Sequence, residues 1–249
     1  MKNILIILIF SNIVFASTFQ MDIGISGGPT MDFSYNERVT INNDYDGFRF
    51  NSGFILNVHL ALGRNDEIQN RILTSVSSMF ETGYNFYNRR RSGRSIFDDD
   101  FEEDYSTYNY HNIILGYLFQ FNFYNGISFG IGSGIFVPLY ISANREDHSL
   151  GFSKYSYMTE FNQKDIASMY KIPFMPYIKL SLFRYMPLSN NKWAYKYGLS
   201  LLYNFGMKLD VDNLVGLAFD RYLKYNFSAL NIEIYFGFSF GKTKWFFIK

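Results

Sequence analysis

The chain has 249 residues, of which 20% are aromatic and only 18% are charged, and its formal net charge is +1. A chain this close to neutral offers no electrostatic basis for binding nucleic acid. The sequence contains no cysteine, which excludes disulfides, thiolate metal sites, cysteine nucleophiles and amino-terminal lipoprotein attachment. Beyond the amino terminus, no apolar run approaches the ~20 residues that a membrane-spanning helix requires.

The amino terminus has the pattern of a secretory signal peptide. A short basic start, MKN, precedes the apolar run ILIILIFSNIVF, whose length of about twelve residues suits a signal sequence and is short for a membrane anchor. Ala16 supplies the small residue expected before a cleavage site, and Val14 stands two positions earlier. We therefore predict a signal peptide over residues 1–16 and one continuous domain over residues 17–249.

The mature chain consists of segments in which apolar and polar residues alternate, which is the pattern of β-strands with two unlike faces. The first segment, residues 19–28, reads FQMDIGISGG, with an apolar residue at every second position from Phe19 to Ile25. Similar segments follow at residues 47–63, 71–86, 105–123, 127–142, 170–184, 193–208 and 225–240. With the first segment these make eight, and an even number favours a closed antiparallel barrel.

The predicted connections alternate between long and short. Long loops are expected at residues 35–46, 87–104, 144–168 and 209–222, and shorter ones at 63–70, 124–126 and 187–191. This alternation is typical of an up-and-down barrel with its long loops outside the cell and its short turns and both termini in the periplasm.

The apolar rows are predicted to face lipid. They contain no Asp, Glu, Lys or Arg, as expected on a surface where Lys or Arg costs about 2–4 kcal/mol at the bilayer midplane. The opposite rows carry too many charges for the dry core of a soluble barrel. Thr74, Ile141 and Met207 belong to the rows predicted to face outward, and aromatic residues near the segment ends are expected to form interfacial girdles.

On these features the chain resembles the small eight-stranded outer-membrane barrels of the OmpA/OmpX/OmpW-like group. The resemblance covers residues 17–240 and rests on architecture, with no signature motif. It implies an all-β, eight-stranded antiparallel transmembrane barrel in the cell outer membrane. The last strand of that group usually ends with Phe; here Phe236, Phe238 and Phe240 look like that strand, but GKTKWFFIK follows them.

An interior this narrow is expected to be filled by its own side chains. The charged residues predicted to form an inward-facing network of ion pairs and hydrogen bonds are Asp22, Arg49, Glu81, Lys179, Lys196 and Glu233. The same network could instead line a narrow, gated pore.

Three histidines are candidates for catalysis: His59 on a polar row, His111 on a lipid-facing row and His148 in the longest loop. Barrels that modify lipid A exist in this size class, but the pairing of His with Ser two residues later is absent here, since Ile113 occupies that position. A histidine at a rim or in a loop without a catalytic role is the favoured interpretation.

The segment RRRSGRSIFDDDFEED, residues 89–104, combines basic and acidic blocks. Its carboxylates could bind a divalent cation, and its arginines could contact lipid phosphates, but mutual pairing on a solvated loop is the simpler expectation. Pro173 and Pro176 lack the amide hydrogen that a strand donates, which predicts a bulge or frayed pairing at residues 172–176.

These features predict a monomeric, non-enzymatic barrel without cofactor or metal, which contacts outer-membrane lipid and an extracellular ligand through four long loops in a structural or surface-interaction role. The alternatives are a narrow porin-like channel for small solutes and a lipid-modifying barrel enzyme.

Overall fold

The computed structural model describes residues 19–37, 47–68, 72–94, 103–147, 155–188, 193–209 and 224–241. The predicted signal peptide and residues 242–249 lie outside these ranges. The signal peptide therefore remains a prediction, as does any part that the last residues have in the final strand.

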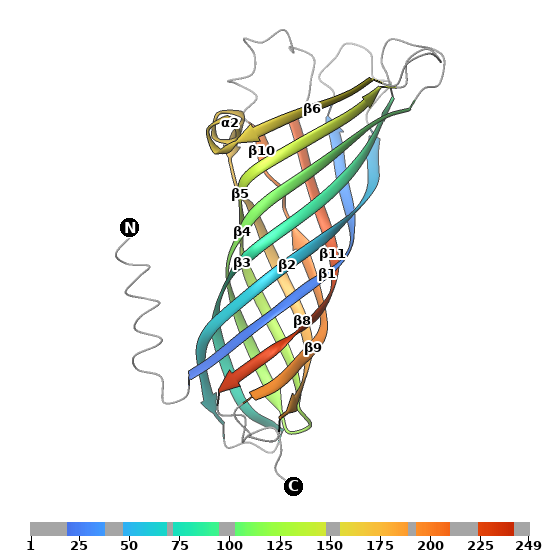
Figure 1. The fold of residues 1–249 in the computed structure, drawn as a ribbon. Helices are drawn as coiled ribbons and strands as arrows, with labels where there is room; N and C mark the ends of the chain where they lie inside the picture. Colours follow the sequence, from blue (N-terminus) through green and yellow to red (C-terminus); the bar gives the residue numbers. More distant parts are fainter. Residues whose placement is uncertain are drawn as a thin grey trace.

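Eight long antiparallel strands close into a barrel (Figure 1). They are β1 (Phe19–Glu37), β2 (Gly47–Glu67), β3 (Leu73–Arg94), β4 (Glu103–Phe123), β5 (Ile127–Asp147), β8 (Met175–Pro187), β9 (Trp193–Asn204) and β11 (Lys224–Gly241). Each pairs with the next around the ring, and β11 pairs with β1 to close it. The predicted fold class is confirmed.

The strands are staggered as they go around the barrel. Paired residues can be followed from Asp22 once around the ring, and the path returns to β1 ten residues further along, at Asp32. A stagger of this size corresponds to a strand tilt of roughly 40° and an interior just wide enough for side chains.

The strands are longer than the sequence predicts, so the predicted loop at residues 87–104 is wrong over most of its length. β3 continues to Arg94 and β4 begins at Glu103, with Arg90 paired to Thr107. Likewise, β1 extends to Glu37, and β5 extends to Asp147. A strand of 21 residues, at about 3.3 Å per residue and a tilt of roughly 40°, rises about 50 Å. The apolar band of such barrels is only about 25 Å tall, so the long-loop end projects beyond the bilayer.

The sixth barrel strand is interrupted. Its upper part, β6 (Tyr155–Asn162), pairs with the upper half of β5, whereas β8 pairs with the lower half. Between them lie α2 (Gln163–Met169) and β7 (Tyr170–Ile172), and β7 pairs with β10 (Lys208–Leu209) instead of β5. The break falls at Pro173, which confirms the predicted irregular pairing at residues 172–176. β6 and α2 also correct the predicted loop at residues 144–168.

Asn162 starts helix α2. Its side chain accepts hydrogen bonds from the backbone of Lys164 and Asp165, while the Asp165 side chain accepts one from the backbone of Asn162. This reciprocal cap stabilises the first turn and directs Ile166 into the barrel core. Within the described ranges, no helix is long and apolar enough to cross a membrane.

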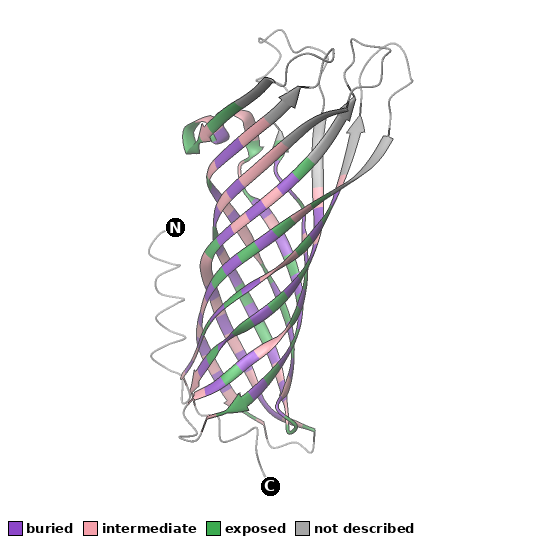
Figure 2. Ribbon diagram, turned by 45° about the vertical axis from the view of Figure 1, so that its right-hand side comes forward, coloured by how far each residue is buried: buried purple, intermediate pink, exposed green. Residues whose placement is uncertain are grey.

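Buried and exposed residues alternate along the strands, and Figure 2 shows this alternation around the barrel. Three residues predicted to face outward are buried instead, each at a local irregularity. The pairing of β3 shifts beside Thr74, and Leu139 is an extra residue in β5 before Ile141. Gly206, with a positive φ of 69°, turns the chain before Met207. A shift of one residue moves the following side chains to the other face.

Candidate functional site

The outer surface of the barrel carries a continuous apolar belt. Tyr84 of β3 and Ile113 of β4 are exposed, and large aliphatic side chains are exposed on the other six barrel strands: Ile23, Ile25, Leu56, Val58, Ile131, Ile178, Leu180, Leu182, Leu199, Leu201, Ile232 and Ile234. So much apolar surface is incompatible with water and suits contact with lipid. A shallow hollow of about 410 Å³ lies in this belt between Tyr117, Ile131, Ile178 and Tyr203.

Aromatic side chains flank the belt at both ends. Near the short-turn end, the rings of Trp193 and Phe240 lie 4.8 Å apart. Toward the long-loop end, Tyr84 bonds to Nδ1 of His111 at 2.5 Å, and the ring of Tyr140 packs against the same histidine. Such amphipathic rings suit the boundary between lipid and water.

The lumen contains five of the six charged residues predicted there. Asp22, Glu81, Lys179, Lys196 and Glu233 are all nearly inaccessible to solvent. Lys196 contacts Asp22 at 2.5 Å, and Lys179 contacts both carboxylate oxygens of Glu81 at 2.6 and 2.5 Å. The sixth residue, Arg49, lies in β2, but its side chain is outside the described part of the structure.

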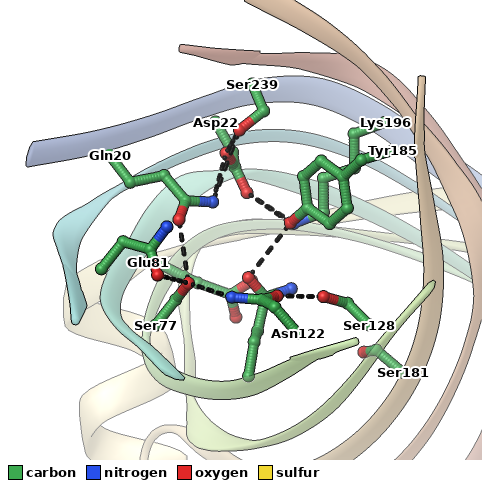
Figure 3. Close-up of polar contacts among 12 residues, drawn as sticks. Gln20, Asp22, Ser77, Glu81, Asn122, Ser128, Ser181, Tyr185, Lys196 and Ser239 are labelled. Carbon is green, nitrogen blue, oxygen red and sulfur yellow. Dashed lines mark hydrogen bonds and ion pairs between the residues drawn. The ribbon is translucent and has the colours of Figure 1, made fainter. Parts of the chain in front are cut away.

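A polar layer in the lower lumen is centred on Asp22 (Figure 3). Besides Lys196, its carboxylate accepts hydrogen bonds from Ser239 at 2.6 Å and Gln20 at 3.1 Å. Lys196 also lies 4.0 Å from the centre of the Phe183 ring, a cation–π contact. Tyr185 donates to Gln120 at 3.2 Å and so extends the layer across the lumen. The carboxylate and ammonium are thus fully surrounded, as buried charges require.

A second polar cluster lies further up the lumen, around Ser26. Ser26 donates to Glu233 at 2.7 Å and contacts Nε2 of His59 at 2.8 Å. Asn57 donates to Ser26 at 3.1 Å. An amide ladder continues across the strands, from Asn112 to Asn85 at 2.5 Å and from Asn85 to Asn57 at 2.6 Å.

The upper lumen contains an ion pair that sequence reasoning missed. Arg89 contacts Asp32 at 2.7 Å, and Tyr87 donates a hydrogen bond to the same carboxylate. For Arg89, the expected place on a solvated loop and the alternative of contact with lipid phosphates are therefore both wrong, because its side chain points inward. Both residues occupy inward positions of strands that extend beyond their predicted ends. Following the alternation of inward and outward positions further along the sequence would have identified them.

An apolar cluster fills the lumen beside this ion pair. It joins residues from most of the barrel strands with Ile166 of α2 and Met207 of the β9–β10 turn; the other members are Ile55, Tyr87, Tyr110, Ile114, Phe136, Ile141, Met175, Tyr177, Leu202 and Ala229. Tyr177 fits here because it faces glycine: a Cβ added to Gly116 would lie 2.2 Å from the tyrosine hydroxyl.

The remaining candidates are dispersed. His111 lies on the outer surface, while His148 and residues 95–102 of the acidic segment fall outside the described residues. Among the side chains that the structure describes, no group of three or more His, Asp or Glu is placed to hold a metal.

No protein-family model matches the chain, and neither does any curated protein. Among solved structures, it is similar to the attachment invasion locus protein Ail of Yersinia pestis in complex with the heparin analogue sucrose octasulfate, with 12% identity, a TM-score of 0.36, and 89% of this chain and 99% of that chain covered. It is also similar to Neisserial surface protein A, with 8% identity, a TM-score of 0.37, and 89% and 96% coverage. A third similar structure is the outer-membrane protease OmpT of Escherichia coli, with 11% identity, a TM-score of 0.40, and 91% of this chain and 97% of that chain covered.

These values are low, so the barrel assignment rests on the chain's own pairing and burial. The ring of eight strands is closed, its outer face is apolar and its lumen is charged and hydrogen-bonded. By strand number, closure and lipid-facing surface, the molecule has the architecture of the small eight-stranded outer-membrane β-barrels.

Proposed function

We propose that this protein is a non-conducting outer-membrane barrel whose role is structural or surface interaction, carried by the end that projects from the bilayer. The observation that supports this most is the filling of the lumen. The Asp22–Lys196 pair with Tyr185, the Glu81–Lys179 pair, and the apolar cluster around Tyr177 lie at successive levels. An ion would have to displace all three in a barrel of this narrow type.

The projecting end offers the contact surface. Arg90, Thr159 and Glu160 are exposed there, on strands that continue past the apolar belt. Since a filled lumen leaves no room for a ligand, recognition falls to this rim and to the segments that connect its strands, residues 38–46, 95–102, 148–154 and 210–223. An extracellular ligand bound by these segments is the partner that we propose, with the protein acting as a monomer.

Planar-bilayer recording tests the filled lumen. We expect the refolded mature chain to give no conductance steps, and a Lys196→Ser/Asp22→Ser/Tyr185→Ser variant to give none either, because the Glu81–Lys179 pair and the apolar cluster still fill the lumen. Adding Glu81→Ser, Lys179→Ser and Tyr177→Ala should make the barrel leak, because all three levels are then opened. The matched control is Leu199→Ala, a substitution on the outer face. Stable steps from the unaltered protein would replace this proposal with the narrow channel.

Two further measurements separate the remaining roles. Cells in which residues 95–102 are replaced by a Gly-Ser linker should lose attachment to a host-cell layer but keep an intact envelope if the role is surface interaction. Envelope leakage only when the whole protein is missing would indicate a structural role.

A lipid-modifying activity predicts that His59→Gln or His111→Gln changes the acylation pattern of outer-membrane lipid; we expect no change.

A further inference from the structure

Strand β6 has an unpaired edge in the described part of the barrel. It pairs with β5 along one edge, and none of the described strands pairs with its other edge, so β6 stands last in the order of the sheet. Among the described strands, β9 does not reach this level: it ends at Asn204, where its pairing with Ala229 of β11 also stops. β6 lies at the long-loop end of the barrel, beside β5 (Figure 1).

A hydrogen bond at the end of β6 shows which backbone groups face the open edge. The amide of Asn162 donates to Oδ2 of Asp165 at 2.9 Å, and so it does not donate to Tyr140, its paired residue on β5. In an antiparallel pair, residues whose N–H and C=O groups point toward the partner alternate with residues whose groups point away. The pairing of β5 with β6 runs without a register shift. The N–H and C=O groups of Glu160 and Met158 therefore point away from β5, toward the open edge.

The side chains around these groups leave the edge accessible. Phe161 packs against the apolar cluster and anchors β6 to the barrel. Beyond it, Met158, Thr159 and Glu160 are all exposed, Met158 by 68%. Since consecutive side chains point to opposite faces of a strand, neither face of β6 is covered at this point. β6 also contains no Lys or Pro, the residues that commonly protect an exposed edge from pairing.

A second copy of the chain in the same membrane does not fit this edge. Two β6 edges can pair about a twofold axis that runs either perpendicular to the barrel wall or along the strands. Copies inserted in the same direction are related instead by an axis along the membrane normal. The perpendicular to the wall lies in the membrane plane, and strands of this barrel type are tilted by roughly 40°. Neither axis therefore coincides with the normal.

We propose that the open edge of β6 binds an extended segment of an extracellular polypeptide, which joins the sheet as an additional strand. An extended backbone carries donors and acceptors at the two-residue spacing of Met158 and Glu160, and addition to a free sheet edge is a common mode of peptide recognition. Because this partner is one form of the extracellular ligand proposed above, its binding depends on the surface-interaction role.

Amide hydrogen exchange of the unaltered, refolded protein tests whether the edge is open. The amides of Thr159 and Phe161 point toward β5 and should exchange slowly. Those of Met158 and Glu160 should exchange about tenfold faster, as expected where one backbone hydrogen bond is lacking. Uniformly slow exchange would show that the edge is already paired within the protein and would overturn the proposal.

A proline on the open edge tests the binding itself. Met158→Pro removes an amide hydrogen from the open edge but no hydrogen bond to β5, and proline is tolerated in edge strands at such positions. Attachment of cells carrying this variant to a host-cell layer should fall about tenfold. The matched control, Met158→Ala, should attach like the unaltered protein. Treatment of the host-cell layer with trypsin should abolish attachment.

The outcomes separate edge binding from the broader function. No attachment by cells carrying the unaltered protein would refute the surface-interaction role itself. Equal attachment by Met158→Pro and the unaltered protein, or equal losses in Met158→Pro and Met158→Ala, would overturn edge binding alone. Attachment that trypsin leaves intact would also overturn it, because the partner would then not be a polypeptide. The exchange measurement does not depend on the folding of any variant.

Discussion

The two ends of this barrel follow opposite rules on the same eight strands. Through the apolar belt, Ile and Leu side chains point outward and the ion pairs of Asp22 and Glu81 lie inside. Toward the long-loop end, an apolar cluster that includes Ile166 and Met207 fills the interior, and Arg90, Thr159 and Glu160 are exposed outside.

The difference shows that the surrounding solvent decides which face of a strand is apolar. Inside the bilayer, lipid covers the outside, and the lumen can hold polar groups only because they satisfy one another. Where the strands leave the bilayer, water covers the outside, and the interior packs like the core of a soluble barrel. The Asp32–Arg89 ion pair is also buried in this second region. The change from a polar to an apolar interior is therefore gradual.

The largest effect is expected from breaking an ion pair in the lower region. Lys196→Met leaves Asp22 charged and buried, at a cost of about 3–5 kcal/mol in the free energy of unfolding. The double variant Lys196→Met/Asp22→Leu should recover much of the loss. Urea unfolding followed by tryptophan fluorescence measures both. A single variant as stable as the unaltered protein would show that the lumen admits water and would erase the contrast between the two ends.

The second largest loss of stability is expected from a truncation in the apolar cluster of the upper region. Ile166→Ala takes a fully buried side chain out of the apolar cluster, and such truncations cost about 2–5 kcal/mol. We expect the loss to be local, with faster amide hydrogen exchange in α2 and β7 and unchanged exchange in β9. Ser168→Ala, on the exposed side of the same helix, is the control. Uniform loss of protection along the barrel would mean that the two regions unfold as one.

The outer surfaces of the two regions should respond differently to the same charge. Leu199→Lys places an ammonium group in the lipid-facing belt and should cost about 2–4 kcal/mol. Thr159→Lys, on exposed β6, should change stability by less than about 0.5 kcal/mol. Equilibrium unfolding from lipid vesicles compares the two. Equal costs would place β6 within the bilayer.

The smallest effect concerns the junction of the two regions. Gly116→Ala brings a methyl group against the hydroxyl of Tyr177, and overpacking of this kind costs about 1–3 kcal/mol. Adding Tyr177→Phe removes the clashing oxygen, so the double variant should be more stable than Gly116→Ala alone. Strict additivity of the two changes would show that the side chains do not touch.

The sequence predicted the strand number, the closure and the lipid-facing rows. These depend on the alternation of apolar and polar residues along each strand, which is a local pattern that the sequence shows directly. It placed Asp22, Glu81, Lys179, Lys196 and Glu233 on polar rows for the same reason. Their partners could not be predicted: Lys179 and Glu81 are 98 positions apart, and only the stagger of the barrel decides which inward residues meet.

Two kinds of error have a physical cause. The sequence predicts a loop at Arg89 because charge runs commonly mark exposed segments, but strands that continue into water can carry charges on either face. Ile141 and Met207 were assigned to the lipid face because alternation counts assume regular pairing. The extra residue at Leu139 and the turn at Gly206 break that count.

The seam between β1 and β11 has a consequence for biogenesis. It joins the first and last strands of the cylinder, from Gln20 beside Gly241 to Glu37 beside Lys224. Until β11 is in place, a sheet built from the preceding strands has two open edges that can recruit strands from other chains. The cylinder can therefore close only after β11 has formed beside β1.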